Sequence, residues 1–280
     1  MGGDIGTLRL PGGAVVARLG QGTWRMGEDP GARAGEIAAL RRGVELGMTL
    51  IDTAEMYGDG GAESLVGEAL RGLRDRVFLV SKVYPQNAGG AALRRACENS
   101  LRRLATDRID LYLLHWRGGV PLKATVDGMS ALQREGRIGA WGVSNFDTDD
   151  MADLFAAGGA GCAADQILYN LMRRGPEFDL LPSLTARSIP AMAYSPIEQG
   201  RLPKTGVLVE VARRCSATPF QVALAWALRR PDVIAIPKAA TIAHVEANRS
   251  AWDLALDDTA LAALDEAFPP PRRKTPLAMI

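Results

Sequence analysis

Short apolar runs recur along this chain, and stretches with helical spacing separate them. VFLV, within 77–82, and LYLL, within 109–115, are apolar on both faces, which is typical of strands in a buried parallel sheet. Between such runs, apolar residues lie three or four positions apart, as at Ile37, Leu40 and Val44. The sequence therefore alternates strands with helices, and we expect strands at 22–24, 49–52, 77–82, 109–115, 139–144, 164–169, 190–194 and 233–238.

About eight strand–helix units within 280 residues predict an α/β fold, a (β/α)8 (TIM) barrel in which residues 1–280 form a single domain. An open doubly wound sheet is the alternative. Its phosphate-binding fingerprint needs three spaced glycines, but Gly58 and Gly60 are followed by Glu63 where the third should stand. The barrel is therefore the favoured fold.

Three further segments have local signals. LRLPGGAVVARLG (8–20) predicts an N-terminal β-hairpin that turns at the Pro-Gly-Gly sequence. Thr218 and Gln221 fit a capping box with Pro219 at the first helical position, so a helix should begin there. The ending PPPRRKTPLAMI (269–280) cannot continue a helix through its prolines, so we expect a C-terminal tail over the barrel.

Composition excludes several classes of function. Lys and Arg number 33 against 32 Asp and Glu, a net charge of +1, so no nucleic-acid or membrane-surface partner is expected. The longest apolar stretch, 222–228, is much shorter than the roughly 18 residues of a membrane span. Cys97, Cys162 and Cys215 are far apart, which argues against disulfides and a metal site. With no export signal in the N-terminal segment, we expect a cytoplasmic, monomeric protein.

Three consecutive predicted strands end in ionisable residues: Asp52 follows TLI, Lys82 follows VFLVS and His115 follows DLYLL. Taken alone, each has a structural explanation, as a cap, a snorkelling side chain or a hydrogen-bonded core imidazole. In a (β/α)8 barrel, however, the carboxyl ends of the strands converge at one rim. A lysine after a fully apolar strand is also costly unless a carboxylate such as Asp52 pairs with it. The three residues together therefore predict a catalytic site.

Tyr57 lies five residues after Asp52, in a segment too glycine-rich for a helix, and its loop is expected to bring the phenol over the barrel mouth. A neighbouring ammonium makes a phenol, with an ordinary pKa of about 10, release its proton more readily. The set therefore predicts a phenol acid, Tyr57, beside the ammonium of Lys82. Asp52 would hold that ammonium, and His115 would orient a carbonyl.

Motifs around these residues recur in order along nearly the whole chain. They are GTW (22–24), GMTLIDTAEMYGDGGAESLVGEAL (47–70), LVSKV (79–83), DLYLLHW (110–116), WGVSNF (141–146), QILYN (166–170), YSPIEQG (194–200) and IPKAATIAHVEAN (236–248). In them the sequence resembles the aldo-keto reductase family, most closely the bacterial branch that includes methylglyoxal reductases. The resemblance implies a (β/α)8 barrel with Asp52, Tyr57, Lys82 and His115 as catalytic tetrad. It also implies an NADPH bound extended across the barrel mouth, without a Rossmann fold.

The same resemblance implies coenzyme contacts. Ser144, Asn145 and Gln166 would hold the nicotinamide carboxamide, Tyr194 would stack on the nicotinamide ring, and Lys238 would meet the 2′-phosphate. A helix beginning near Thr241 would offer backbone N–H groups to that anion. The full implied set is Thr23, Trp24, Asp52, Ser144, Asn145, Gln166, Tyr194, Ser195, Pro196, Gly200, Leu202, Lys238, Ala239, Thr241, His244 and Asn248.

The adenosine end departs from the family's common pattern. His244 stands where many relatives have arginine, and Ala247 where they often have glutamate, whereas Asn248 is kept. A histidine is a weaker and pH-dependent phosphate ligand. We therefore expect NADPH as the coenzyme, with NADH possible but weaker.

The expected substrate is a small carbonyl compound. Short loops follow the fourth and seventh strands, HWRGGV and YSPIEQGRLP, which leaves little chain for a deep lid. Such an open pocket suits short 2-oxoaldehydes such as methylglyoxal, and aromatic aldehydes. The residues expected to wall the pocket are Trp24, Met56, Tyr57, His115 and Trp116.

Two other functions stay open at this level. The same barrel can carry a Schiff-base aldolase with Lys82 as the nucleophile and Tyr57 as the proton donor. A regulatory protein that binds NADPH tightly, senses redox state and turns over slowly is the second alternative.

Overall fold

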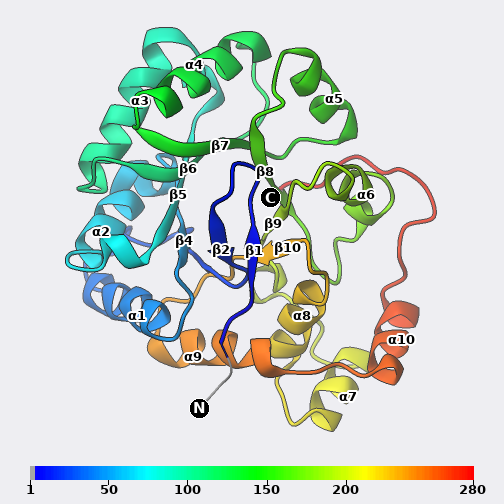
Figure 1. Cartoon of the computed structure of the whole chain (residues 1–280). Coiled ribbons are helices and arrows are strands. Elements are labelled where there is room, and N and C mark those ends of the chain that lie inside the picture. Colours follow the sequence, from blue (N-terminus) through cyan, green and yellow to red (C-terminus); the bar gives the residue numbers. More distant parts are fainter. Residues whose placement is uncertain (1–3) are drawn as a thin grey trace.

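The computed structural model describes residues 4–280, and its main feature is an eight-stranded parallel sheet that curls into a barrel (Figure 1). The edge strands meet where the Gly22 amide donates to the Pro237 carbonyl (3.1 Å) and the Gly20 amide to the Ala235 carbonyl (2.9 Å). The strands are β3 (Gln21–Gly22), β4 (Leu50–Asp52), β5 (Phe78–Val83), β6 (Ile109–Leu114), β7 (Ile138–Ser144), β8 (Cys162–Leu168), β9 (Ala191–Tyr194) and β10 (Val233–Ala235).

Helices surround the barrel on its outside (Figure 1). Local signals explain where several begin: Thr218 and Gln221 form the predicted capping box of α8, and Asp147 and Asp150 form another at α5. The helices are α1 (Arg33–Glu45), α2 (Gly61–Ala69), α3 (Gly90–Arg103), α4 (Leu122–Arg134), α5 (Thr148–Ala156), α6 (Leu180–Thr185), α7 (Val207–Arg214), α8 (Pro219–Leu228), α9 (Ile242–Ser250) and α10 (Asp258–Ala267).

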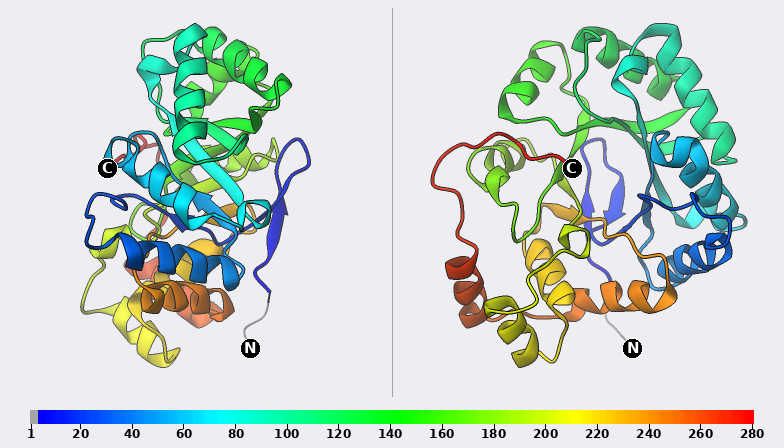
Figure 2. Two further views of the ribbon diagram at one scale, coloured as in Figure 1. Left: turned by 90° about the vertical axis from the view of Figure 1, so that its left-hand side faces the viewer. Right: turned by 180° about the vertical axis from the view of Figure 1, so that it is seen from behind.

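An antiparallel hairpin, β1 (Thr7–Arg9) and β2 (Val15–Ala17), covers the end of the barrel at which the strands begin. Leu10 and Val16 of this hairpin pack in one buried cluster with Leu50, Leu111 and other inward-facing strand residues. Seen from the side, the hairpin lies at one end of the barrel and the C-terminal tail at the other (Figure 2). The carboxyl ends of the strands are thus left facing the tail.

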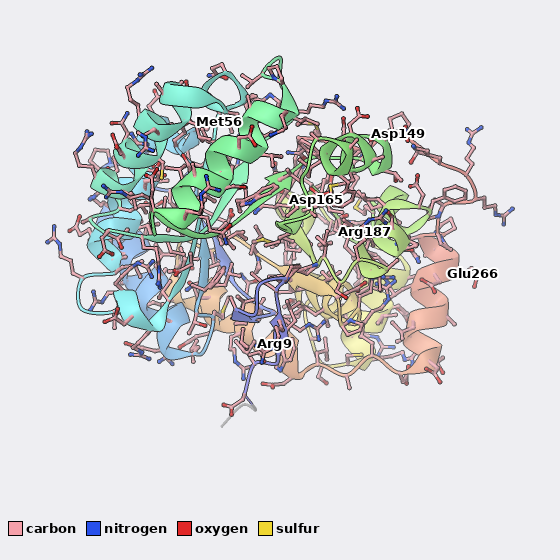
Figure 3. The ribbon with its side chains drawn as sticks, turned by 45° about the horizontal axis from the view of Figure 1, so that its top comes forward. Arg9, Met56, Asp149, Asp165, Arg187 and Glu266 are labelled. Carbon is pink, nitrogen blue, oxygen red and sulfur yellow. The ribbon has the colours of Figure 1, made fainter. Side chains whose placement is uncertain are left out.

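The tail after α10 runs without helix along the outside and then turns over the barrel mouth (Figures 1 and 2). Lys274 ties it to Asp149 of α5, with the Nζ and Oδ2 atoms 2.9 Å apart. Asp149 is labelled in the upper right part of the molecule in Figure 3. Leu277 packs against the main hydrophobic core. The tail is therefore anchored before Met279 and Ile280, which reach the rim.

The barrel, the hairpin and the tail confirm the fold expected from the sequence. The first barrel strand, however, is Gln21–Gly22 rather than 22–24, because Thr23 already begins a turn whose carbonyl accepts from the Met26 amide. The last barrel strand ends at Ala235 rather than 238. Within residues 4–280, no helix combines the length and apolarity needed to cross a bilayer.

Candidate active site

The two-residue period of the strands points three ionisable side chains into the barrel mouth. Leu50, Val80 and Leu113 belong to the buried cluster inside the barrel. Asp52, Lys82 and His115 lie two positions after these residues, so their side chains point the same way, one layer closer to the rim. The alternation that builds the core therefore also assembles the site.

Lys82 is the centre of the site. Its Nζ donates hydrogen bonds to Asp52 Oδ2 (2.8 Å) and to the Thr53 carbonyl oxygen (2.9 Å). It also donates to Tyr57 Oη at 3.1 Å, and the His115 ring lies with its centroid 5.8 Å from that of Tyr57. The structure thus brings together Asp52, Tyr57, Lys82 and His115, all of them buried.

Tyr57 reaches this position through a tight left-handed turn. It begins a 3₁₀ turn, Tyr57–Gly60, rather than an irregular loop, and Gly58, Asp59 and Gly60 have φ angles of 55°, 49° and 87°. Two of the three are glycines, which adopt positive φ without steric cost. The glycine-rich segment thereby folds the phenol back over the end of β4.

Burial and the neighbouring charges shift the pKa values of Lys82 and Tyr57 in opposite directions. Burial would lower the pKa of the Lys82 ammonium, but the Asp52 carboxylate and Tyr57 outweigh it, so the pKa is raised and Lys82 stays charged. Burial raises the pKa of Tyr57 above its usual value, and the Lys82 charge offsets only part of this rise. The pKa of Tyr57 is therefore raised, whereas the sequence analysis expected the Lys82 ammonium to lower it.

His115 is a neutral imidazole in this environment. Burial, with a smaller contribution from the Lys82 charge, lowers its pKa to about 2. Among the described residues, its Nδ1 atom has no hydrogen-bond partner. An unpaired N–H is costlier to bury than a lone pair, so we place the proton on Nε2. A neutral Nε2–H is a hydrogen-bond donor for the cavity.

A cavity of about 880 Å³ opens above the tetrad and extends to α9. Trp24, Met56 and Trp116 line it beside Tyr57 and His115, as expected for a substrate pocket. The Trp24 and Tyr57 rings meet edge to face with centroids 4.9 Å apart. The walls beside the tetrad are therefore largely apolar, apart from the Tyr57 hydroxyl and the His115 imidazole.

Amide and hydroxyl groups from β7, β8 and β9 form a connected network in the same cavity. Gln166 Nε2 donates to Asp52 Oδ1 (2.7 Å), and Ser144 Oγ to the Gln166 carbonyl (2.8 Å). Asn145 Nδ2 donates to Ser144 Oγ (3.1 Å), and its Oδ1 accepts from the Tyr194 hydroxyl (2.9 Å). These strand ends bond to one another and also line the open cavity, which suits recognition of a primary amide.

The residues that we expect to meet the 2′-phosphate lie at the far end of the cavity. Lys238 is exposed, lines the cavity and pairs through its backbone with Gly22. Helix α9 begins directly after Thr241, and His244 and Asn248 project from it into the same lining. A cation beside a helix N-terminus is a suitable anion site. An aromatic face, an amide network and this anion site, in one elongated cavity, fit a nicotinamide dinucleotide with a 2′-phosphate.

Most of the coenzyme residues implied by the resemblance line this cavity, and three do not. Leu202 and Ala239 are buried outside the lining, and Thr241 caps α9 through a hydrogen bond from the His244 amide. Sequence reasoning in turn missed a group of lining residues. Ile197 and Gln199 lie inside the quoted YSPIEQG motif, but Phe220 and the tail residues carry no sequence signal of a site. The missed residues are Gly22, Arg25, Ile197, Gln199, Thr218, Phe220, Gln221, Ile236, Met279 and Ile280.

Comparisons with known proteins match this geometry. The family model for the aldo/keto reductases matches residues 18–268. The methylglyoxal reductase YeaE of Escherichia coli strain K12 is 53% identical over 279 residues, which cover 98% of each chain. A Klebsiella pneumoniae aldo/keto reductase solved with NADP and acetate is 54% identical with a TM-score of 0.95, covering 98% of this chain and 99% of that one. Another from that organism, solved with NADPH, is 53% identical with a TM-score of 0.96 and full coverage of both chains.

Proposed function

The chain belongs to the aldo/keto reductase family, and we propose that it reduces short 2-oxoaldehydes such as methylglyoxal, and aromatic aldehydes, with NADPH. The protein is an oxidoreductase that reduces carbonyl compounds with NADPH. The observation that carries the substrate proposal is the pair Tyr57 and His115 at the foot of an open cavity, beside the apolar side chains of Trp24, Met56 and Trp116.

Tyr57 is proposed to protonate the carbonyl oxygen. The Lys82 ammonium donates to Tyr57 Oη, so the phenol oxygen acts as acceptor there and its own hydrogen is left to point into the cavity. As the proton leaves, negative charge develops on Oη, 3.1 Å from a fixed positive charge. This interaction strengthens only as the reaction proceeds, which is the condition for lowering a barrier. Asp52 holds Lys82 in place for that purpose.

His115 is proposed to orient the same carbonyl oxygen. Because its imidazole is neutral, it donates a hydrogen bond through Nε2 without competing with Tyr57 as an acid. Bound NADPH supplies the hydride for the carbonyl carbon. The chain's own contribution is to place the carbonyl oxygen between a proton donor and a hydrogen-bond donor, beside apolar walls.

The coenzyme contacts are part of the proposal. Ser144, Asn145 and Gln166 would bind the carboxamide, and Tyr194 the nicotinamide ring. Lys238 would pair with the 2′-phosphate, which only NADPH carries, and this supports NADPH over NADH. His244 stands at the same end as a weaker contact.

The substrate class follows from the walls of the pocket. Trp24, Met56 and Trp116 provide apolar and aromatic surface but no carboxylate or amide to hold a polyol. An aldehyde activated by a neighbouring carbonyl accepts hydride readily and needs few binding contacts. The relative from Escherichia coli is a methylglyoxal reductase, which supports the same class.

The geometry disfavours the aldolase alternative. A Schiff base needs a neutral, accessible amine, whereas Lys82 is fully buried, charged and hydrogen-bonded to Asp52, Thr53 and Tyr57. Borohydride trapping with a carbonyl substrate should therefore leave Lys82 unmodified. A redox sensor would share the whole binding site, so it differs from a reductase only in rate.

A matched carbonyl panel tests the proposal. NADPH oxidation would be followed with methylglyoxal, an aromatic aldehyde, glucose and a steroid ketone, and kcat compared with the rate of coenzyme release. We expect kcat/KM to be highest for methylglyoxal and the aromatic aldehyde. A preferred sugar or steroid would contradict the substrate class, and turnover far slower than coenzyme release with every carbonyl would favour the sensor.

We also propose that residues 1–280 act as one domain, and that the protein is monomeric and cytoplasmic. One continuous sheet carries all eight parallel barrel strands, which supports a single domain. Cys97 and Cys162 are buried free thiols, which suits a reducing compartment. A single cooperative unfolding transition would support the single domain, and light scattering tests the monomeric state.

A further inference from the structure

Glu55 is a charged residue beside the tetrad to which the proposed function gives no role. It lies between Asp52 and Tyr57, is half-buried and lies outside the described cavity lining. Its Oε1 atom accepts hydrogen bonds from the Tyr84 amide (2.7 Å) and from Asn87 Nδ2 (3.3 Å). Both donors are neutral, and they belong to the segment that follows β5. The Glu55 side chain therefore joins the loop after β4 to the loop after β5.

A second bond ties the same residue to β5. The Glu55 amide donates to the carbonyl oxygen of Lys82 (3.3 Å), which lies in the strand that carries the ammonium of the tetrad. Two residues further on, the Tyr57 amide donates to the Ala54 carbonyl (3.1 Å) and closes a turn around Glu55. The backbone and the side chain of Glu55 thus fix this turn to the end of β5, and the turn brings the Tyr57 phenol to Lys82 Nζ.

The chain after Tyr57 gives the backbone of this residue little support. Gly58 and Gly60 have φ angles of 55° and 87°, and glycine loses more conformational freedom on ordering than any other residue. Support for the Tyr57 backbone must therefore come from residues 53–56. Among these, Glu55 has side-chain hydrogen bonds, whereas the Thr53 hydroxyl has no partner among the described residues.

We propose that Glu55 is a positioning residue. By holding the turn 54–57 against the end of β5, it sets the place of the Tyr57 phenol relative to the Lys82 ammonium. This role rests on the proposed function, in which Tyr57 is the proton donor. Reaction rates depend steeply on such geometry, and a displacement of about 1 Å can cost about 10²-fold. Because both donors to Glu55 are neutral, the role requires the length and the acceptor oxygen of its side chain but not its charge.

Substitutions at position 55 separate length and acceptor from charge. With NADPH prebound and methylglyoxal added, Glu55→Ala should lower the single-turnover rate of NADPH oxidation about 10- to 100-fold, and leave the Kd for NADPH within about twofold. Glu55→Gln keeps the length and an acceptor oxygen, so its rate should stay within about threefold of that of the unmodified protein. Glu55→Asp keeps the charge but is one methylene shorter, so it should lose more than Glu55→Gln. The opposite order would contradict a positioning role, and this order decides even if Glu55→Ala does not fold.

Removing the group that Glu55 positions gives the sharpest test. In the Tyr57→Phe background no phenol hydrogen is left to direct, so adding Glu55→Ala should lower the single-turnover rate by less than about threefold further. A general effect on the fold would lower the rate by the same factor in both backgrounds.

Asp257→Ala is the matched control for lost stability. Asp257 Oδ1 also accepts from a backbone amide, that of Ala260 (2.7 Å), but at the start of α10 and outside the described cavity lining. Its substitution should lower Tm by about 2–4 °C and leave the single-turnover rate unchanged.

Three results would overturn the assignment. An unchanged rate in Glu55→Ala would remove it, and so would an equal further loss in the Tyr57→Phe background. An unchanged rate with a raised KM for methylglyoxal would assign Glu55 to the pocket wall instead, where the Tyr84 and Trp116 rings meet with centroids 6.0 Å apart. A Tyr57→Phe variant that kept the rate of the unmodified protein would contradict the proposed function itself, and is thereby distinguishable.

Discussion

Replacing Lys82 by methionine should destabilise the folded protein, because Asp52 then stays buried without its partner. Lys82 Nζ and Asp52 Oδ2 are 2.8 Å apart, and their side chains are 0% and 3% exposed. After the substitution, Asp52 keeps the hydrogen bond from Gln166 but loses the positive charge. Removing one member of a buried pair costs about 3–5 kcal/mol, equivalent to a fall in Tm of about 6–15 °C.

The loss of stability in Lys82→Met should be smaller at low pH than at high pH. Burial is the largest influence on Asp52 and raises the pKa of its carboxyl, and without Lys82 the opposing charge is gone. When the pKa of a carboxyl is higher in the folded state than its unfolded value of about 3.9, its contribution to stability is fully present below pH ~3.9. Stability then falls as the pH rises toward the folded pKa. Lys82→Met should therefore lose less Tm near pH ~5 than near pH ~8.

Thermal melts of the coenzyme-free protein measure both effects, with Asp52→Asn and the double variant completing a cycle. The double variant buries no charge, so its loss should be about 1–3 kcal/mol smaller than the sum of the single losses. Lys123 is the control: it is 67% exposed and paired with Asp127, so Lys123→Met should change Tm by less than about 2 °C. Strictly additive losses of stability would contradict an energetic coupling between Lys82 and Asp52. A loss of Tm in Lys82→Met that is independent of pH would contradict it too.

Two further predictions concern other parts of the molecule. Lys238→Met should raise the Kd for NADPH about 10- to 100-fold and leave NADH nearly unchanged in calorimetric titrations, and equal losses for both would contradict a 2′-phosphate contact. Asp165 of β8 lies among packed side chains (Figure 3). Burial raises the pKa of its carboxyl well above the usual range, and a hydrogen bond from the Phe146 backbone opposes only part of this rise. Ionisation of Asp165 therefore costs stability as the pH rises. The free energy of unfolding of Asp165→Asn in urea titrations should exceed that of the unmodified protein by about 1–3 kcal/mol near pH ~8 and by little near pH ~4. A gain that is independent of pH would refute this prediction.

The positions of three members of the tetrad were predictable from the sequence because one rule places them. A strand with two-residue alternation and an apolar interior fixes which way its last residue points, so Asp52, Lys82 and His115 had to converge once the barrel was recognised. The pKa direction of Tyr57 was not predictable in the same way. It depends on how deeply the packed walls bury the phenol, and burial is a property of the whole fold.

Other parts of the site depend on geometry that the residue types do not encode. Arg25 follows a predicted motif, but its positive φ emerges only in the folded turn. Phe220 lies within the predicted capping box of α8, yet its exposure to the cavity depends on how α8 sits against the rim. Leu202 and Ala239 show the converse, because motif position implied coenzyme contacts while packing buries both outside the lining.

Tyr57→Phe separates proton donation from every other contribution of the site. The substitution removes one hydroxyl and keeps the ring that packs against Trp24. With methylglyoxal and NADPH, kcat should fall about 10²- to 10⁴-fold, while the Kd for NADPH in a calorimetric titration stays within about twofold of the unmodified value. A variant that retained kcat near that of the unmodified protein would contradict Tyr57 as the acid, and with it the mechanism proposed for this reductase.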